Sequence, residues 1–256
     1  MLTVGLRREA LDVVEARFPK LPYMQVRWAD KVTELIERHD LTRCLELGCF
    51  QGKSTAFIAA TLRALGRGHL TTIDRLNALE RKPNVHEVLD ALGLEPWVTV
   101  HLEPRSLTWR LMRMLETQPQ PRFDFVYMDA GHTWDVTGFA FLLVDRLLEP
   151  GGFIIFDDLD WTLADYAERL GEEAPARLAK LPSEERTTPQ VRKVWELLVA
   201  PDPNYELIKD GKRGIARKRR RWLAQRLPWH RRKSSAGGWP PYLSLRLMGT
   251  VELLRR

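Results

Sequence analysis

Cysteine is scarce in this sequence, in which only Cys44 and Cys49 occur among 256 residues. This pair forms neither a disulfide framework nor a Cys-x-x-Cys metal or redox motif. The chain also lacks an apolar run of the ~18–20 residues that span a membrane. Charges at Arg7, Arg8 and Glu9 leave no apolar core for a signal peptide. We therefore expect a soluble protein of a reducing cytoplasm.

The composition shows no strong bias either, with 44% hydrophobic and 29% charged residues, 16 glycines and 16 prolines. These values exclude a collagen-like, wholly disordered or disulfide-scaffold protein. The net charge of +6 is unevenly distributed. Residues 217–256 hold 12 basic residues and one acidic residue, which leaves 28 basic and 33 acidic residues in the rest of the chain. The net positive charge of the chain therefore comes from the C-terminal segment, and the rest of the chain has a net negative charge.

The pattern of apolar residues predicts an α/β protein. Two amphipathic helices, at 6–18 and 28–38, precede a regular alternation of short apolar runs and helical segments. We expect strands at 42–47, 69–73, 97–102, 123–128 and 153–156, helices at 54–65, 85–92, 107–116 and 134–148, further helices at 163–181 and 191–199, and a closing hairpin at 205–208 and 214–217. Strands separated by helices indicate a Rossmann-like, doubly wound sheet, here seven-stranded and mostly parallel with an antiparallel hairpin strand.

Three parts of the chain are expected: an N-terminal helical cap at 1–40, an α/β domain at 41–217 and a basic tail at 218–256. Residues 217–233 carry nine basic residues, with Trp222 and Trp229 among them. Such a segment suits contact with nucleic acid or with an anionic membrane surface, although a solvated, partly flexible extension explains it equally well. A helix over 243–254 would pack on the domain or on a second subunit of a homodimer.

Polar residues follow the expected strands where each one ends. In open α/β sheets, ligands bind outside the carboxyl ends of the strands. The residues at these ends are Glu46 to Gly52, Asp74, Arg105 with Ser106, Asp129 to His132, and Asp157 with Asp158. A single aspartate in such a place often only caps the next helix. Carboxylates at four strand ends point instead to a shared binding site.

The loop after the first strand contains Gly48 and Gly52, which allow a tight turn and a close helix start. It lacks the Gly-x-Gly-x-x-Gly spacing of dinucleotide sites. A ligand without a pyrophosphate is therefore favoured, and an NAD(P) oxidoreductase is disfavoured. Asp74, at the end of the second strand, can accept the two hydroxyls of a ribose.

Four segments, LELGCFQGKST, LTTID, FDFVYMDAGH and LLEPGGFIIFDD, resemble the ordered motifs of class I S-adenosylmethionine-dependent methyltransferases. The resemblance covers about residues 30–217. It is closest to small-molecule O-methyltransferases with Asp-Gly-x-His and Asp-Asp motifs, such as macrolide-sugar, rhamnosyl and cephalosporin-type enzymes, and more distantly to catechol O-methyltransferase. Ala130 and Pro104-Arg105-Ser106 depart from the usual pattern.

The resemblance implies a role for each matching residue. S-adenosylmethionine would bind along Glu46, Gly48, Gly52, Ser54, Asp74, Ser106 and Asp129. A divalent cation, Mg²⁺ by its preference for oxygen ligands, would be held by Asp129, Asp157 and Asp158. His132 matches a catalytic base, with Asp129 as the competing base.

The residues support this chemistry independently, because three carboxylates at adjoining strand ends repel one another unless a cation or protons intervene. A hydroxyl acceptor also needs a base or a metal to remove its proton. The sequence thus predicts a metal-assisted O-methyltransferase acting on a sugar or other small metabolite. Two alternatives stay open: a nucleic-acid-modifying methyltransferase guided by the basic tail, and a non-catalytic protein that keeps the fold.

Overall fold

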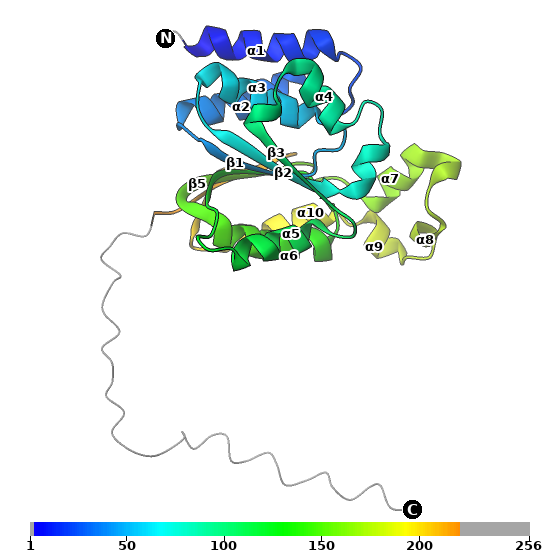
Figure 1. The fold of residues 1–256 in the computed structure, drawn as a ribbon. Coiled ribbons are helices and arrows are strands. Elements are labelled where there is room, and N and C mark those ends of the chain that lie inside the picture. The colour runs from blue at the N-terminus through cyan, green and yellow to red at the C-terminus, as the bar shows by residue number, and fades with distance from the viewer. Residues whose placement is uncertain (1–2, 221–256) are drawn as a thin grey trace, which may run out of the picture. The chain divides into compact units, whose positions relative to one another are not determined.

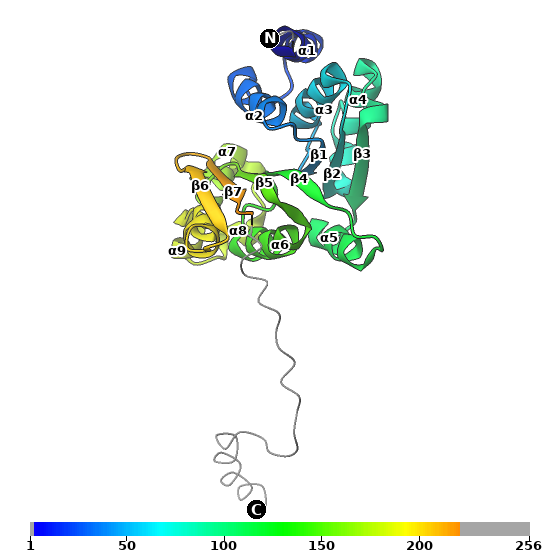
Figure 2. The ribbon, with the colours of Figure 1, turned by 90° about the vertical axis from the view of Figure 1, so that its left-hand side faces the viewer.

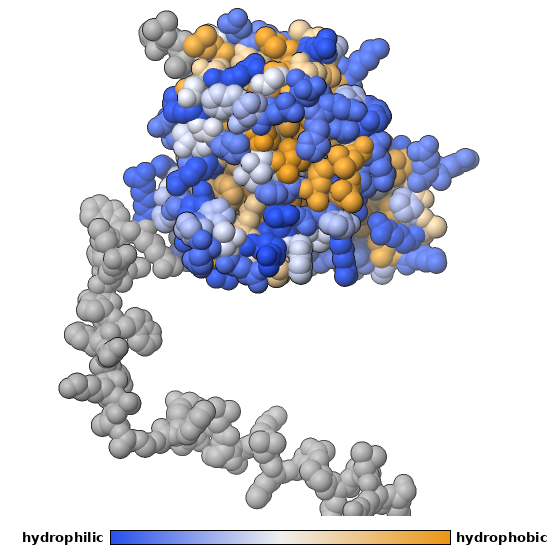
Figure 3. Space-filling view, viewed as in Figure 1, coloured by the Kyte–Doolittle hydropathy of each residue, from blue (hydrophilic) through white to orange (hydrophobic). Residues whose placement is uncertain are grey.

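The computed structural model describes residues 3–220 of the chain, and all structural statements below concern this part. The features expected between residues 221 and 256, including the flexible break and the helix at 243–254, lie outside the described residues. Within residues 3–220, no helix has both the length and the apolar character of a bilayer-spanning segment. Polar residues cover most of the face shown in Figure 3, and apolar side chains gather over its β2–β3 side.

A single seven-stranded sheet forms the centre of the protein, in the order β3-β2-β1-β4-β5-β7-β6. The strands are β1 (Arg43–Leu47), β2 (His69–Arg75), β3 (Val98–Glu103), β4 (Phe123–Met128), β5 (Leu148–Phe156), β6 (Tyr205–Lys209) and β7 (Gly214–Lys218). Strands β1 to β5 pair in parallel. Strand β7 pairs antiparallel with both β5 and β6. The predicted doubly wound sheet with an antiparallel hairpin is confirmed.

Helices cover both faces of this sheet (Figures 1 and 2). One face carries α1 (Thr3–Arg17), α2 (Val26–Arg38), α3 (Lys53–Leu65) and α4 (Val85–Leu92), and the other carries α5 (Leu107–Glu116), α6 (Trp134–Leu147) and α10 (Gln190–Val194). Successive side chains of a strand point to opposite faces. Accordingly, Cys44 joins the first core and Leu45 the second. Burial on both faces explains why the strands are almost continuously apolar.

The two N-terminal helices are part of the first core. Leu11, Val14 and Trp28 are buried in the same cluster as the side chains of α3. The buried Lys53 of α3 donates to the carbonyl of Leu21, in the α1–α2 loop, at 3.0 Å. The position of α3, whose N-terminus borders the candidate site, is therefore tied to the N-terminal segment.

Three local predictions differ from the structure. The helix expected at 163–181 is divided into α7 (Leu163–Leu170), a 3₁₀ turn (Gly171–Glu173) and α8 (Ala176–Ala179), and α9 (Ser183–Thr187) follows. Gly171 and Pro175 account for the breaks. The helix at 191–199 changes to a π-helical turn at Trp195–Val199. Strand β5 begins at Leu148 because this residue pairs with Phe123 ahead of a bulge, so residues 149–152 lie in the strand.

Candidate functional site

The carboxyl ends of the central strands lie side by side, as the sequence predicted. The parallel pairing continues one residue beyond each strand. Gly48 N donates to Ile73 O at 2.9 Å, Asp129 N to Leu47 O at 2.9 Å, and Asp157 N to Met128 O at 3.0 Å. Backbone hydrogen bonds therefore hold the starts of the functional loops in register.

Gly48 is required by the neighbouring strand end. Its φ is +94°, and a Cβ there would lie 2.2 Å from the carbonyl oxygen of Asp129. Gly52 also has a left-handed φ of +91°, and a Cβ would lie 3.0 Å from Val85 Cγ2. The first glycine thus lets the β1 loop approach β4, and the second lets α3 start against α4.

Asp74 holds this glycine-containing loop through hydrogen bonds to its backbone. Its Oδ2 accepts hydrogen bonds from the backbone N–H groups of Cys49 at 2.9 Å and Phe50 at 2.7 Å. Its Oδ1 accepts from Arg75 N at 2.7 Å. An ionised carboxylate has about four acceptor sites, so Asp74 retains capacity for a further donor. Asp74 thus lies at the end of β2 next to the loop that contains Gly48 and Gly52. This is where the sequence analysis expects a carboxylate that binds ribose hydroxyls.

Glu46 is fully buried in the middle of this region. Its Oε2 accepts hydrogen bonds from the hydroxyls of Thr55 at 2.6 Å and Thr72 at 2.7 Å. Its Oε1 has no hydrogen-bond partner among the described residues. Burial raises the pKa of Glu46 to about 7, against the opposing effect of hydroxyl donors that include Ser54. The side chain of Ser54 is buried in the first turn of α3.

Asp129, His132 and Asp158 form a cluster at the ends of β4 and β5. His132 Nε2 lies 3.3 Å from Asp129 Oδ1 and 3.5 Å from Asp158 Oδ2. Although Nε2 is buried, it makes no well-aligned hydrogen bond. One nitrogen or oxygen atom from each residue lies within 4.8 Å of the other two, which is compatible with a shared metal ion.

Electrostatics in this cluster favour charged groups. Burial by itself lowers the pKa of His132, but the two neighbouring carboxylates outweigh it and raise this pKa to about 9. Burial raises the pKa of Asp129, opposed by His132. The close approach of His132 lowers the pKa of Asp158. At neutral pH the cluster is therefore an imidazolium between two carboxylates. Both His132 and Asp158 have φ +52°, a conformation uncommon for residues other than glycine.

Asp157 lies apart from this cluster and is held by other partners. Its Oδ2 accepts a hydrogen bond from the Tyr127 hydroxyl, and its Oδ1 lies 2.5 Å from Arg213 Nε. Its Oδ1 also accepts from Asp158 N at 2.8 Å. Trp28 completes the arrangement, since its Nε1 donates to the Tyr127 hydroxyl at 3.0 Å and Arg213 stacks on its ring at 4.5 Å. Of the three predicted cation ligands, the structure thus groups Asp129 and Asp158 with His132.

The remaining predicted residues take separate places. Ser106 caps α5, where its Oγ accepts from Thr108 N at 3.3 Å. Trp161, which follows the fifth strand, packs against His132 with ring centroids 4.9 Å apart and ring planes tilted by 39°. Trp134 is 42% exposed. Sequence reasoning missed Tyr127 and Arg213, because a tyrosine within an apolar strand and an arginine in a hairpin turn carry no local signal of function.

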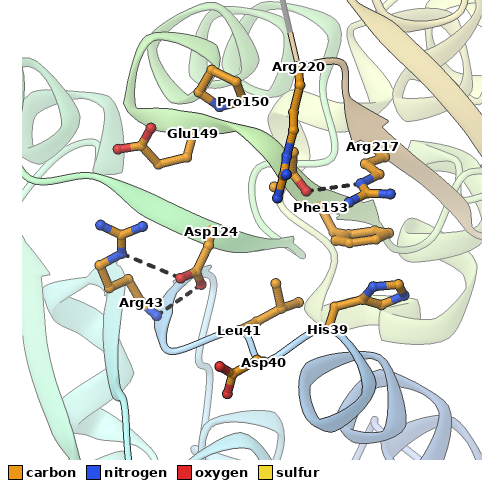
Figure 4. Close-up of a pocket in the computed structure, with 12 residues that line it drawn as sticks. His39, Asp40, Leu41, Arg43, Asp124, Glu149, Pro150, Phe153, Arg217 and Arg220 are labelled. Carbon is orange, nitrogen blue, oxygen red and sulfur yellow. Dashed lines mark hydrogen bonds and ion pairs between the residues drawn. The ribbon is translucent and has the colours of Figure 1, made fainter.

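A pocket at the opposite edge of the sheet is a separate feature (Figure 4). It lies where β1, β4 and β5 begin, and its charged side chains largely pair within the protein. Asp124 accepts from Arg43 N at 2.9 Å and lies 3.4 Å from Arg43 Nε, and Arg217 Nε donates to Gly151 O at 3.1 Å. We therefore place the candidate site at the carboxyl edge.

Comparison with known protein families gives a match in the central part of the chain. A family model described as a methyltransferase domain matches residues 45–159, the segment from β1 to the loop after β5. No curated protein matches the chain.

Several solved structures share the fold. The O-methyltransferase TomG from Streptomyces achromogenes, involved in tomaymycin synthesis and solved with SAM, is 21% identical over 82% of this chain and 90% of its own, with a TM-score of 0.55. An O-methyltransferase from Bacillus cereus solved with SAH is 18% identical over 84% and 91%, with a TM-score of 0.57. The SAH-bound methyltransferase PaMTH1 from Podospora anserina is 18% identical over 84% and 87%, with a TM-score of 0.53.

At these identities the structural matches establish the shared fold, while the family match covers the segment that carries every strand-end motif of the candidate site. The sheet order with its antiparallel β7 is that of class I methyltransferases. The chain therefore contains a class I S-adenosylmethionine-dependent methyltransferase domain.

Proposed function

We propose that this methyltransferase acts on a hydroxyl group of a small metabolite, a sugar or another secondary metabolite, with the help of a divalent cation such as Mg²⁺. The observation that carries the proposal is the cluster of Asp129, His132 and Asp158 at the edge of the sheet where the Gly48–Gly52 loop lies. The fold shared with TomG and with the Bacillus cereus O-methyltransferase supports transfer to oxygen.

The residues around β1 and β2 fit the cofactor. Bound S-adenosylmethionine supplies a methyl group on a positively charged sulfur. Asp74 retains acceptor capacity for ribose hydroxyls, and the buried Glu46 Oε1 has no other partner among the described residues. The acidic edge of the sheet suits a cationic cofactor, since Glu46, Asp74 and Asp129 all lie there. Gly48, Gly52 and Ser54 shape the loop and the first turn of α3 that complete this side. We assign Ser106 only an indirect role, through the start of α5.

The second cluster fits a divalent cation. The carboxylates of Asp129 and Asp158 would hold the cation through their oxygens, and His132, whose Nε2 makes no aligned hydrogen bond, would lie beside it as the base. A bound cation would make an acceptor hydroxyl more acidic. A bound cation would offset the charges of Asp129 and Asp158, and the imidazolium form of His132 would then lose its stabilisation. Nε2 would then accept the proton of the hydroxyl. Asp157, which is buried and pairs with the half-buried Arg213, holds Asp158 in place by accepting from its backbone N–H.

Cofactor binding tests the first half of the proposal. Asp74→Asn should weaken SAH binding about 10-fold or more in calorimetry, because charge-assisted hydrogen bonds contribute ~1.5–3 kcal/mol. Asp90→Asn, at an exposed position in α4, is the matched control and should bind SAH normally. Unchanged SAH affinity in Asp74→Asn would remove Asp74 from the cofactor site.

Metal removal tests the second half. EDTA should abolish methyl transfer and Mg²⁺ should restore it. Asp129→Asn and Asp158→Asn should each require much more Mg²⁺ for half-maximal activity. Asp157→Asn should lower thermal stability, since it uncouples Arg213 and Tyr127. Full activity in the presence of chelator would refute the role of the cation and leave the methyltransferase assignment intact.

A further inference from the structure

Helix α10 contacts both of the strand-end loops that carry His132 and Asp158. His132 belongs to the loop between β4 and α6, and Asp158 belongs to the loop between β5 and α7. Both residues have a left-handed φ of +52°, a conformation that costs free energy in residues other than glycine. Such backbone persists only where surrounding contacts hold it in place. Each loop therefore needs a support outside itself.

The loop of His132 is held by Gln190, the first residue of α10. The amide N–H of Trp134, at the first position of α6, donates to Gln190 Oε1 at 2.7 Å. The side chain of Thr133, the N-cap residue of α6, makes no hydrogen bond to the helix end, so Gln190 supplies the acceptor in its place. Gln190 is buried, and its Nε2 donates to Glu185 O at 3.0 Å, so the side-chain amide is fixed at both ends.

The loop of Asp158 is held by Arg192, two residues further along α10. The Nε and Nη2 of Arg192 donate to Asp160 Oδ1 at 2.9 and 2.5 Å. Its Nη2 also donates to Gly211 O, in the turn between β6 and β7, at 2.8 Å. Arg192 therefore connects the loop after β5 to α10 and to the hairpin turn.

The hairpin turn also contacts the loop of Asp158 directly. Leu159 N donates to Lys212 O at 3.1 Å, and Arg213 Nε lies 2.5 Å from Asp157 Oδ1. The residues immediately before and after Asp158 are thus both attached to this turn, which α10 holds in its place.

The position of α10 itself is fixed by the second core. Val191, Val194 and Trp195 are buried there. Gly214, the first residue of β7, lies against the indole ring of Trp195, and a Cβ at this glycine would be 2.5 Å from Cε3 of that ring. A helix packed this closely cannot shift without disturbing the core. The polar side chains of α10 therefore extend from a rigid support.

We propose that Gln190 and Arg192 are positioning residues that fix the two loops relative to each other. They thereby arrange His132 and Asp158 for a cation and an acceptor hydroxyl before either binds. The proposal rests on the proposed function and adds to it the residues that set the geometry of its site. Replacing residues that orient metal ligands typically changes metal affinity about 10–100-fold. A partly exposed ion pair such as that of Arg192 with Asp160 contributes little to overall stability, so its loss should affect mainly the loop.

Metal binding by the full-length protein provides the first test, with Gln190→Met and Arg192→Met. In calorimetry on protein saturated with SAH, each variant should bind Mg²⁺ about 10-fold more weakly than wild type. Each should bind SAH with unchanged affinity. Lys193→Met is the matched control, because Lys193 lies in the same helix and pairs with Glu196 of the following turn at 2.8 Å. It should bind both ligands like wild type.

Hydrogen–deuterium exchange of the ligand-free protein tests the loops without any metal. Gln190→Met should speed up exchange at residues 131–136, and Arg192→Met should do so at residues 157–161 and 210–213. The rest of the described chain should exchange as in wild type, and Lys193→Met should change neither loop. Faster exchange throughout would indicate a general loss of stability and would overturn the proposal.

The outcomes distinguish this proposal from the proposed function. If wild-type protein binds SAH but no Mg²⁺, the proposed cation is refuted, and the exchange data by themselves support or overturn the positioning role. Unchanged exchange in both loops, or Mg²⁺ affinities equal to that of wild type, would overturn the positioning role while the cofactor and cation sites stand. A parallel loss of SAH and Mg²⁺ binding would also overturn it, because the two residues would then only support the fold.

Discussion

Replacing Glu46 by glutamine should stabilise the cofactor-free protein at pH 8 and do so much less at pH 5. Glu46 is fully buried, and burial is the main reason that its pKa rises from the ordinary 4.5 to about 7. When folding raises the pKa of a carboxyl group, the folded protein is most stable at low pH, where this group is protonated in both the folded and the unfolded state. That stabilisation is present below pH 4.5 and is lost as the pH rises to 7.

The size of the effect follows from the shift in pKa. One pKa unit corresponds to ~1.36 kcal/mol, so the change from 4.5 to about 7 corresponds to about 3 kcal/mol in the free energy of unfolding. Glutamine has nearly the same shape and keeps one oxygen to accept from Thr55 and Thr72. It never ionises, so it avoids this loss. The stability gain of Glu46→Gln should grow from about 1 kcal/mol at pH 5 to about 3 kcal/mol at pH 8.

Urea unfolding of the cofactor-free protein, followed by tryptophan fluorescence at pH 5, 6, 7 and 8, measures this difference. Glu34→Gln, whose side chain in α2 is 45% exposed, is the matched control and should follow the wild-type pH dependence. Parallel pH dependences for Glu46→Gln and wild type would refute the reasoning. If Glu46 also contacts the cofactor, Glu46→Gln should bind SAH more weakly than wild type. Cofactor binding would then explain why the protein has a carboxylate that lowers its stability at neutral pH.

Other predictions concern residues that hold the site and its supports. Gly48→Ala should lower the free energy of unfolding by ~3 kcal/mol or more in urea titrations, because its Cβ would meet a backbone oxygen at 2.2 Å. Gly66 is the control, since it has a φ of +67° but open space around it, and Gly66→Ala should cost about 1 kcal/mol. Equal losses would refute the role of crowding. Ser106→Ala should cost about 1 kcal/mol through the lost helix cap and leave SAH affinity unchanged in calorimetry; a loss of affinity would favour direct contact with the cofactor. Arg7→Met should lower stability by ~3–5 kcal/mol in thermal or urea unfolding, since it leaves Glu37 and other buried acceptors without their cation, and a change below 1 kcal/mol would contradict this.

Local patterns in the sequence were sufficient for the main architecture. Apolar runs that end in polar residues located β1 to β5 because parallel strands are buried on both faces, and the same rule placed Asp74, Asp129 and Asp158 at one edge. Residues 149–152 were misassigned because a proline and two glycines resemble a turn, whereas pairing of Leu148 with Phe123 extends the strand. Pairing between residues that are far apart in the sequence cannot be recognised from the residues next to them.

The partners of individual side chains lay further beyond the reach of the sequence. The sequence alone does not distinguish the roles of the adjacent aspartates Asp157 and Asp158. Successive residues at a strand end point in different directions, so Asp157 turns towards Tyr127 and Arg213 while Asp158 approaches His132.

The sequence by itself determined the order of strands and helices, the chemistry available at each strand end and the kinship with methyltransferases. Only the tertiary structure decided which of these groups meet. His132 reaches Asp158 across 26 residues of chain, and Tyr23 reaches Arg169 across a much longer span, because the sheet aligns strand ends from distant parts of the sequence. Contacts between residues far apart in sequence depend on the packing of whole elements, and local propensity carries no information about them.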